Sequence, residues 1–250
     1  MAKSIEELDH AMTPLGELIL RRRCIRSLDH AEIFEVKLDG EFLMSSLVNN
    51  AEIALSDIGL KNASLDGVAQ AQVVDRDVLV GGLGLGYTAK AALDADHVRS
   101  VTVIELLEPV IRWHDDRLVP LSGDLLGDPR CKIVLGDFFE LFKPNDSRPE
   151  DFGTQAYHAI LLDIDHSPSC LLQSSNSAFY TERSMRLVVR RLHPGGVFAF
   201  WSADPPESNL IDCLKLVFSE VAIHECRFLN PLLNKEDVNW IVTAQKNQQS

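Results

Sequence analysis

Basic residues are scarce in this 250-residue chain, which has 24 Lys and Arg against 37 Asp and Glu and a formal net charge of -13. Nucleic acids and anionic membrane surfaces are bound through basic patches, so this balance argues against both kinds of partner. It leaves room for a cationic ligand, although acidity by itself mostly serves solubility. The one dense basic cluster, Arg21 to Arg23 with Arg26, indicates either a salt-bridged strand or a contact with an anion or partner.

Other signals are missing as well. The five cysteines are odd in number and never spaced as CxxC, so we expect neither a disulfide framework nor a zinc knuckle. The eight histidines show no HxxxH or HExxH spacing, and we therefore predict no metal site. The absence of GxSxG and of a Walker lysine disfavours an α/β-hydrolase or a P-loop enzyme. Without a long apolar run or an apolar signal core in MAKSIEELDH, we expect a cytoplasmic protein.

Two regions differ in their patterns, and we place the boundary between residues 1–60 and 61–250. In the first region, apolar and polar residues alternate over Ile33 to Leu38, Asp39-Gly40 is a hairpin signal, and a second run covers Glu41 to Met44. This pattern predicts a small β-hairpin. The residues from Asn50 to Leu60 suit an amphipathic helix that leads into the second region.

The second region alternates short β-rich runs with helical stretches, which is typical of a parallel α/β sheet. The last two β-rich runs have no long helix between them, so we expect an antiparallel pair at one sheet edge. The predicted strands are Val78–Val80, Ser100–Ile104, Cys131–Leu135, Ala159–Leu162, Val197–Trp201, Val221–Phe228 and Val238–Ala244. The predicted helices are Thr88–Leu93, Pro109–Leu118, Phe179–Leu192 and Leu210–Phe218.

A glycine-rich turn follows the first of these strands, in the run VLVGGLGLGYTA. Such a turn lets backbone approach a ligand closely and directs the amides of a helix N-terminus toward it. Gly82, Gly84 and Gly86 suit the turn of class I S-adenosylmethionine (AdoMet) enzymes, whereas Gly84-x-Gly86-x-x-Ala89 also satisfies the dinucleotide pattern. Both ligands stay open at this point.

Acidic residues end the next strands. Glu105 terminates the second strand, where an acid either accepts hydrogen bonds from both ribose hydroxyls of an adenosine or caps the following helix. Asp137 follows the third strand, where it suits the adenine amino group while Phe138 packs against the ring. Asp163 and Asp165 follow the fourth strand and emerge at the carboxyl edge of the sheet, where open α/β sheets bind ligands. Two carboxylates there suit a cationic amine and can accept its proton.

The order of these motifs resembles spermidine synthase-like proteins of the class I AdoMet-dependent methyltransferase superfamily. It runs from GGLGLG through VIELLEPVIRW, DPRCKIVLGDFFE and YHAILLDIDHSP to FYTERSMRLVVRRLHPGGVFAFW and spans residues 32–246. The resemblance implies an α/β, Rossmann-like seven-stranded sheet, mostly parallel with an antiparallel last strand, after a small N-terminal β region. It also implies site roles: a glycine turn, a ribose-binding acid, an adenine-binding acid and a base for the attacking amine, at Gly82, Gly84, Gly86, Glu105, Asp137 and Asp163.

Three positions depart from the family pattern on the substrate side. The amine-binding aspartate of the family's GGGDGG loop corresponds to Leu85. The second aspartate of its DxxD segment corresponds to His166, unless Asp165 substitutes for it. The family's Tyr-His-Glu segment is Asn50-Ala51-Glu52. We therefore predict an AdoMet-binding transferase that moves methyl from AdoMet to a small-molecule acceptor such as a cationic amine, with Asp163 as proton acceptor.

Three alternatives remain. The first is a polyamine aminopropyltransferase that uses decarboxylated AdoMet, with Asp163 and Asp165 holding the amine. The second is a non-catalytic nucleoside-binding module, dimeric through the hairpin region. An NAD-dependent oxidoreductase is weaker, because no Tyr-x-x-x-Lys or comparable hydride-transfer set is present.

Overall fold

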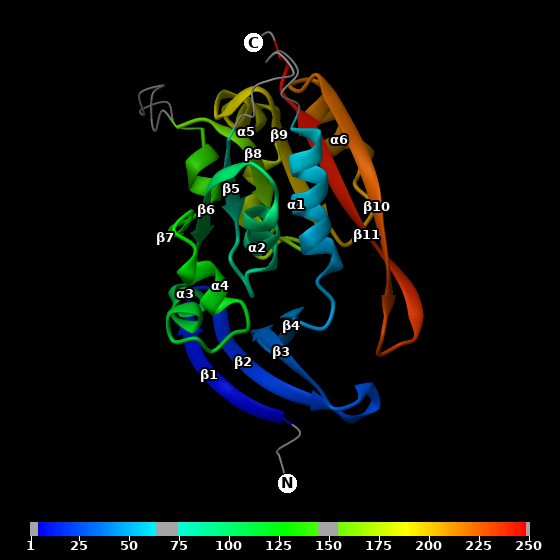
Figure 1. Ribbon diagram of the computed structural model, residues 1–250. Coiled ribbons are helices and arrows are strands. Elements are labelled where there is room, and N and C mark those ends of the chain that lie inside the picture. Colours follow the sequence, from blue (N-terminus) through cyan, green and yellow to red (C-terminus); the bar gives the residue numbers. More distant parts are fainter. Residues whose placement is uncertain (1–4, 64–74, 145–154, 249–250) are drawn as a thin grey trace.

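The computed structural model describes residues 5–63, 75–144 and 155–248, which form two β-sheets placed one below the other in Figure 1. The smaller sheet is an antiparallel meander in the order β1-β2-β3-β4. Its strands are β1 (Ile5–Thr13), β2 (Gly16–Ile25), β3 (Ala31–Leu38) and β4 (Glu41–Ser45). The predicted hairpin is β3–β4, but β1 and β2 were missed, so the N-terminal region is a four-stranded sheet.

The arginine cluster explains why β2 was missed, because three consecutive arginines hide the alternation of a half-buried strand. Leu18 and Leu20 of β2 are fully buried, while the side chains of Arg21 and Arg23 both reach Glu35 on β3, at 2.7 and 3.2 Å. Arg22 pairs with Glu6 on β1 at 2.6 Å. The cluster is therefore a salt-bridged strand, the first of its two interpretations.

The larger sheet has seven strands in the order β10-β11-β9-β8-β5-β6-β7. Neighbouring strands from β9 to β7 run parallel, and β11 is antiparallel to both β9 and β10. This arrangement confirms the predicted fold class and the antiparallel last strand. The strands are β5 (Arg76–Gly81), β6 (Val98–Glu105), β7 (Cys131–Leu135), β8 (Tyr157–Leu162), β9 (Leu192–Ser202), β10 (Glu220–Asn230) and β11 (Lys235–Gln245).

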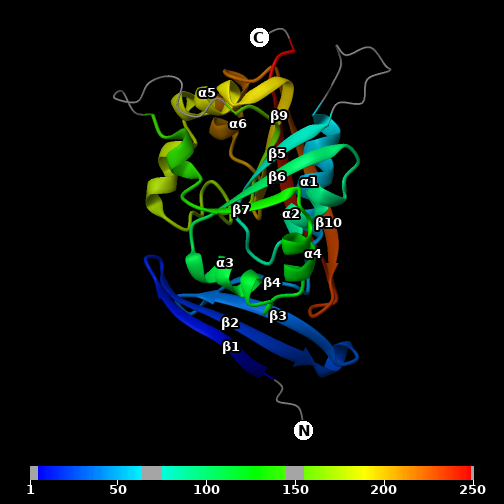
Figure 2. The same ribbon diagram turned by 60° about the vertical axis from the view of Figure 1, so that its left-hand side comes forward.

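Helices cover both faces of the larger sheet (Figures 1 and 2). One face packs against α1 (Asn50–Asn62) and α2 (Tyr87–Asp94), and the other against α5 (Glu182–Arg190) and α6 (Ser208–Lys215). Two short helices, α3 (Glu108–Asp115) and α4 (Ser122–Gly127), lie toward the N-terminal sheet (Figure 2).

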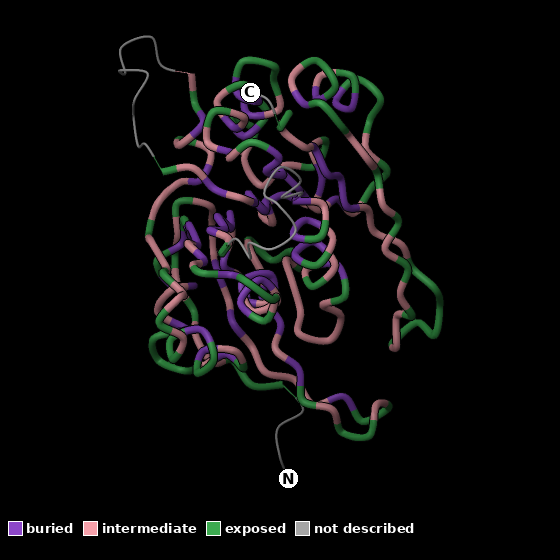
Figure 3. Tube along the Cα trace, turned by 45° about the horizontal axis from the view of Figure 1, so that its top comes forward, coloured by how far each residue is buried: buried purple, intermediate pink, exposed green. Residues whose placement is uncertain are grey.

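Successive residues of the central strands supply the cores of the two faces in turn, as the pleat requires. Figure 3 shows the resulting buried interior, with exposed segments at the hairpin tips.

Three predicted helices end at least two residues away from the prediction, and the last of them, α6, ends at Lys215 rather than Phe218. The helix predicted over Phe179–Leu192 is shorter, because Thr181 caps α5 by accepting a hydrogen bond from the Ser184 amide, and Leu192 already belongs to β9. α3 ends at Asp115 rather than Leu118. The division of the chain at residue 60 stays a prediction, and α1, assigned to the first region, packs on the larger sheet.

No helix in the described ranges has both the length and the apolar character needed to cross a membrane. The cytoplasmic location expected from the sequence stays a prediction.

Candidate functional site

A cavity of about 400 Å³ opens at the carboxyl edge of the parallel strands, a size typical of small-molecule sites. Its walls come mainly from the turns after β5, β6, β7 and β8, the segment from β4 into α1, and one face of the β10–β11 hairpin. Leu15 and Glu35 of the N-terminal region and Trp201 of β9 also border it. All six residues predicted to bind a nucleoside border it, together with Asp163. Asp165 is the one predicted site residue that does not.

The glycine turn forms one wall because β5 ends at Gly81 and α2 begins at Tyr87. Gly82, Gly84 and Gly86 all have positive φ, at 94°, 48° and 95°. A Cβ at Gly82 would lie 2.2 Å from the backbone oxygen of Asp163, so the turn is held tightly against the end of β8. The backbone conformation thus requires glycine and exposes main chain to the cavity.

Glu105 is 8% exposed and holds the turn in place. One carboxylate oxygen accepts the amide of Leu83 at 2.9 Å and the other accepts that of Leu107 at 2.7 Å. Burial raises the pKa of Glu105, and backbone amides at its own and the neighbouring turn oppose that shift. The side chain thus joins two turns that line the cavity, and its role toward a ribose stays a prediction.

Asp137 and Phe138 follow β7 and differ in their surroundings. Asp137 borders the cavity and accepts the amide of Phe139 at 2.8 Å. Phe138 is only 1% exposed, because its ring packs against Gly81 and among Phe139, Phe142 and Phe179. Phe138 still borders the cavity, and its packing against an adenine stays a prediction. Leu106, which is 39% exposed in the cavity wall, offers a second apolar surface.

Asp163 directly follows β8 and borders the cavity. The Thr88 hydroxyl, from the first turn of α2, donates to its Oδ2 at 2.5 Å. Burial raises the pKa of Asp163, and the Thr88 hydrogen bond opposes that shift. The residue keeps part of its surface open to the cavity. Its position suits a group that exchanges a proton with a ligand.

Glu52 is a cavity residue that the sequence-based site set omitted. It lies on the first turn of α1, borders the cavity, and has its pKa raised to about 8 by burial and by the charge of Asp163. Two carboxyl groups, one from α1 and one from the residue after β8, thus border the same cavity. The sequence did contain a signal for this residue, because Glu52 is the one residue of the family's Tyr-His-Glu segment that this chain retains.

Asp165 has a structural environment, contrary to the expectation that it holds an amine. It is 4% exposed and accepts hydrogen bonds from the Leu172 amide at 2.8 Å, the Asn176 side chain at 2.9 Å and the Tyr180 hydroxyl at 3.4 Å. These bonds organise the segment between β8 and α5. Its carboxylate therefore points into protein rather than into the cavity, which His166 borders instead.

The charge of the cavity wall is acidic. Among the described residues it contains no lysine or arginine, and six carboxylates border it: Glu35, Glu52, Glu105, Asp137, Asp163 and Asp237. Glu35 is neutralised by its two arginines. Apolar side chains fill the wall beside the glycine turn, where Leu85 is 3% exposed and the Met44 sulfur would lie 2.9 Å from a Cβ at Gly84.

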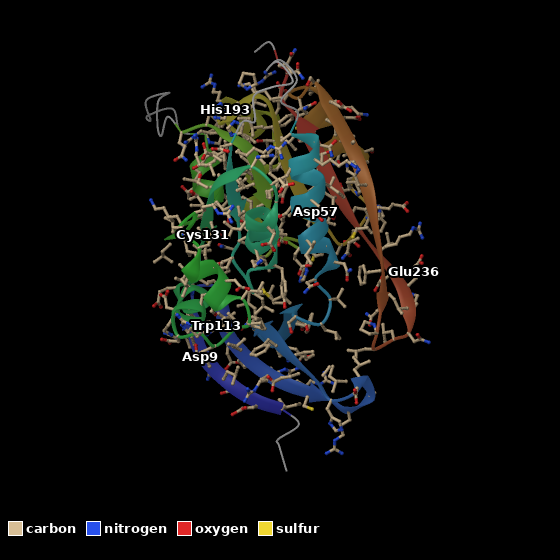
Figure 4. The ribbon with its side chains drawn as sticks, viewed as in Figure 1. Asp9, Asp57, Trp113, Cys131, His193 and Glu236 are labelled. Atoms are coloured by element: carbon tan, nitrogen blue, oxygen red, sulfur yellow. The ribbon has the colours of Figure 1, made fainter. Side chains whose placement is uncertain are left out.

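A second group of ligating side chains lies at the opposite edge of the sheet. Atoms of Asp77, His158 and His193 lie within 4.8 Å of one another, which the search for histidine spacing missed. Figure 4 places His193 at the end of the molecule away from the N-terminal sheet. The Asp77 carboxylate is held by Arg99 and Ser100, and His158 Nδ1 accepts the Asp77 amide at 3.0 Å. These contacts hold the Asp77 and His158 side chains in place.

Comparison with known proteins shows which family this chain resembles in sequence. The family model of the spermine/spermidine synthase domain matches residues 65–228. Polyamine aminopropyltransferase 2 of Pseudomonas aeruginosa is 28% identical over 156 residues, which are 58% of this chain and 40% of that protein. A polyamine aminopropyltransferase of Sulfolobus acidocaldarius is 27% identical over 147 residues, covering 57% of this chain and 43% of the relative. The chain thus spans less than half the length of these relatives.

Solved structures agree on the fold. A spermidine synthase crystallised with the transition state analogue AdoDATO superposes with a TM-score of 0.70 at 16% identity, covering 96% of this chain and 74% of that one. Spermidine synthase from Thermotoga maritima gives a TM-score of 0.69 at 16% identity, with 96% and 73% covered. The same architecture therefore extends through both sheets.

Proposed function

The chain belongs to the spermine/spermidine synthase family, and from this premise we propose that it transfers an aminopropyl group from decarboxylated AdoMet to an amine. The names of its relatives, polyamine aminopropyltransferases, support this reaction over the methyl transfer expected from the sequence. The proposed acceptor is a small cationic amine, and the donor is proposed to bind in the cavity described above.

The charge of the cavity wall is the observation that favours decarboxylated AdoMet over AdoMet as the donor. AdoMet and decarboxylated AdoMet share an adenosine and a sulfonium, but AdoMet also has a carboxylate. That carboxylate needs a cationic partner in a confined site, and the described wall holds carboxylates without any lysine or arginine. An acidic wall favours the decarboxylated donor, whose free amine and sulfonium are both positive.

The adenosine is proposed to bind between the glycine turn and the ends of β6 and β7. Gly82 and Gly84 allow close approach of main chain, while Glu105 and Asp137 supply acceptors for the ribose and the adenine amino group. Leu106 covers an apolar ring face. When bound, the donor supplies a carbon activated by the sulfonium leaving group.

Asp163 and Glu52 are proposed to bind the acceptor amine. A protonated amine has no free electron pair, so it must lose a proton before it attacks. Thr88 occupies Oδ2 of Asp163, which leaves Oδ1 to accept that proton. The amine lone pair then forms the new C–N bond while the C–S bond breaks, and the electron pair of that bond stays on sulfur as a neutral thioether. Most of the catalysis is positioning.

Glu52 also bears on the departure at Leu85. Where the family's glycine loop carries an amine-binding aspartate, this chain has a buried leucine. Glu52, which this chain retains from the family's Tyr-His-Glu segment, supplies a second carboxylate beside Asp163. We infer that these two carboxylates hold the amine without an acid in the turn, and that aminopropyl transfer is retained.

Binding and turnover test this function on the same protein. In calorimetric titrations we expect decarboxylated AdoMet to bind at least about tenfold more tightly than AdoMet, the consequence of about 1.4 kcal/mol of charge repulsion. With 1,4-diaminobutane, mass spectrometry should detect the aminopropylated amine and methylthioadenosine. Tighter binding of AdoMet with a methylated product would overturn the proposal in favour of methyl transfer. Nucleoside binding without turnover on any amine would indicate the non-catalytic module.

A further inference from the structure

His166 is a residue of the cavity wall that the proposed reaction does not use. It lies three residues beyond Asp163, in the segment between β8 and α5, and it is partly buried. Of the described residues that border the cavity it is the one histidine, and that part of the wall has no lysine or arginine. Imidazole is the side chain that takes up and releases protons near neutral pH. The described wall thus contains a single imidazole, close in sequence to the proposed proton acceptor.

Contacts on both sides hold the backbone of His166 in place. Asp165 before it is fixed by the three hydrogen bonds described above, and Ser167 after it is only 1% exposed. The backbone oxygen of His166 accepts the amide of Ala203, just after β9, at 2.7 Å. Its ring lies near that of Trp201 in the cavity wall, with 6.2 Å between the centroids. The imidazole is therefore held at the cavity by packed neighbours, as a functional side chain requires.

The proposed transfer releases one proton in each turnover. The acceptor enters as an ammonium and the donor as a sulfonium, whereas the products are a secondary ammonium and a neutral thioether, so one positive charge must leave as a proton. That proton first reaches Asp163, where burial raises the pKa, and the neighbouring Glu52 has its pKa raised as well. A carboxyl group whose neutral form is favoured keeps its proton. Asp163 must therefore pass the proton on before it can accept one from the next amine.

We propose that His166 is the proton exit of this site, taking the proton from Asp163 and releasing it to solvent. In this step the O–H bond of Asp163 breaks, its electron pair stays on the carboxylate, and a ring nitrogen of His166 forms the N–H bond that it then gives up to water. Acids stabilise the imidazolium: burial raises the pKa of Asp165, and the charge of His166 is among the effects that oppose this rise. This inference rests on the proposed function, and His166 acts through Asp163 rather than on the substrate.

Pre-steady-state kinetics test this role, because the first turnover needs only an unprotonated Asp163, whereas each later turnover needs the proton to leave. With decarboxylated AdoMet and 1,4-diaminobutane, we expect His166→Gln, which stays polar but carries no proton, to keep the single-turnover rate within about twofold and to lower steady-state kcat about tenfold. Added imidazole should restore kcat to within about threefold, since it takes the proton in place of the side chain. His10→Gln, at an exposed position on β1, is the matched control and should change neither rate.

The outcomes separate this inference from the proposed function. If His166→Gln lowers both rates equally without rescue by imidazole, or leaves both unchanged, His166 is not the proton exit although the chain still transfers aminopropyl groups. If the unaltered protein makes no aminopropylated amine, the proposed function fails, and the proton exit fails with it. Calorimetric titration with methylthioadenosine checks that the variant is folded. Should that affinity be lost, His166→Asn replaces it in the same measurements, with the same results expected.

Discussion

Glu52 and Asp163 are two carboxyl groups that share one pocket in the protein interior. Burial favours the neutral form of each, and the charge on one further disfavours the charge on the other. Near neutral pH such a pair retains at least one proton. This lowers the free energy of unfolding, because both groups ionise freely in the unfolded chain. An arriving ammonium removes that cost by supplying the missing positive charge.

Replacing Glu52 tests this cost directly. The pKa of Glu52 is raised in the folded protein to about 8, so the folded state binds more protons than the unfolded state between about pH 4.5 and pH 8. Stability therefore falls as pH rises through that window. We expect Glu52→Gln to raise Tm at pH 8 by about 2–4 °C and to have little effect at pH 4. Calorimetric scans at the two pH values measure it, and a gain that is equal at both would contradict the assigned cause.

Asp163→Asn removes the proposed proton acceptor while keeping its shape. We expect kcat for aminopropyl transfer to fall about a hundredfold or more, the usual contribution of a positioned general base. Affinity for methylthioadenosine, measured by calorimetry, should stay within about twofold. Asp124→Asn, an exposed acid on α4, is the control and should retain full activity. A loss of nucleoside affinity equal to the loss of kcat would assign Asp163 to binding instead.

The strand–turn–helix element from β5 to α2 shows why one local motif organises so much of the site. Gly82 lies against the end of β8, Glu105 binds the turn from β6, and the Thr88 hydroxyl at the start of α2 reaches Asp163. The neutral ring of His114, whose pKa burial lowers, donates through Nε2 to the Gly84 oxygen at 2.9 Å beneath the turn. The turn is thus held from four directions.

Adding one methyl group to this element tests its tightness. In Gly82→Ala the new Cβ would meet the backbone oxygen of Asp163, which cannot move as a flexible side chain can. We expect affinity for decarboxylated AdoMet to fall about ten- to a hundredfold from the backbone strain. Gly123→Ala on α4 has no atom within 4 Å of the added Cβ and is the matched control. Calorimetric titration measures both, and equal affinities for the two variants would show that the turn is not part of the donor site.

Elements with a strong local pattern were predicted well, whereas charged strands were not. The glycine turn, the carboxyl-end acids and the strands of the larger sheet follow from short apolar runs and the residues that end them. β1 was missed because five of its nine residues are polar and none of the nine is buried. Its pairing with β2 depends on residues that carry no periodic apolar signal.

At the scale of the whole molecule, the N-terminal sheet borders the cavity and is joined to the larger sheet's domain by a partly buried contact. Asp9 on β1 accepts hydrogen bonds from Trp113 Nε1 at 2.6 Å and from Arg112 at 2.7 Å, both on α3. Figure 4 shows Asp9 and Trp113 side by side where the two parts meet. Met44 on β4 of the same sheet lies against Gly84 of the glycine turn.

The substitution Asp9→Asn should weaken this contact between β1 and α3. Burial favours the neutral acid, but the hydrogen bonds from Trp113 and Arg112 outweigh it and lower the pKa of Asp9. A lowered pKa contributes stability above the ordinary value near 3.8 that is lost as pH falls through the folded value. We expect the variant to lose about 1–2 kcal/mol of unfolding free energy at pH 7 and to equal the unaltered protein at strongly acidic pH. Urea denaturation at both pH values measures this, and an unchanged midpoint at pH 7 would contradict it.

The sequence by itself determined the α/β fold, the glycine turn and the acids that follow each strand, because these depend on residues that are neighbours along the chain. Only the tertiary structure decided which acids share the cavity. It brings Glu52 from α1 and Asp237 from the last hairpin to the cavity wall. It also directs the side chain of Asp165 into a loop, where the carboxylate is hydrogen-bonded. The direction of a side chain beyond a strand end is set by what packs around it, and that packing comes from distant parts of the chain.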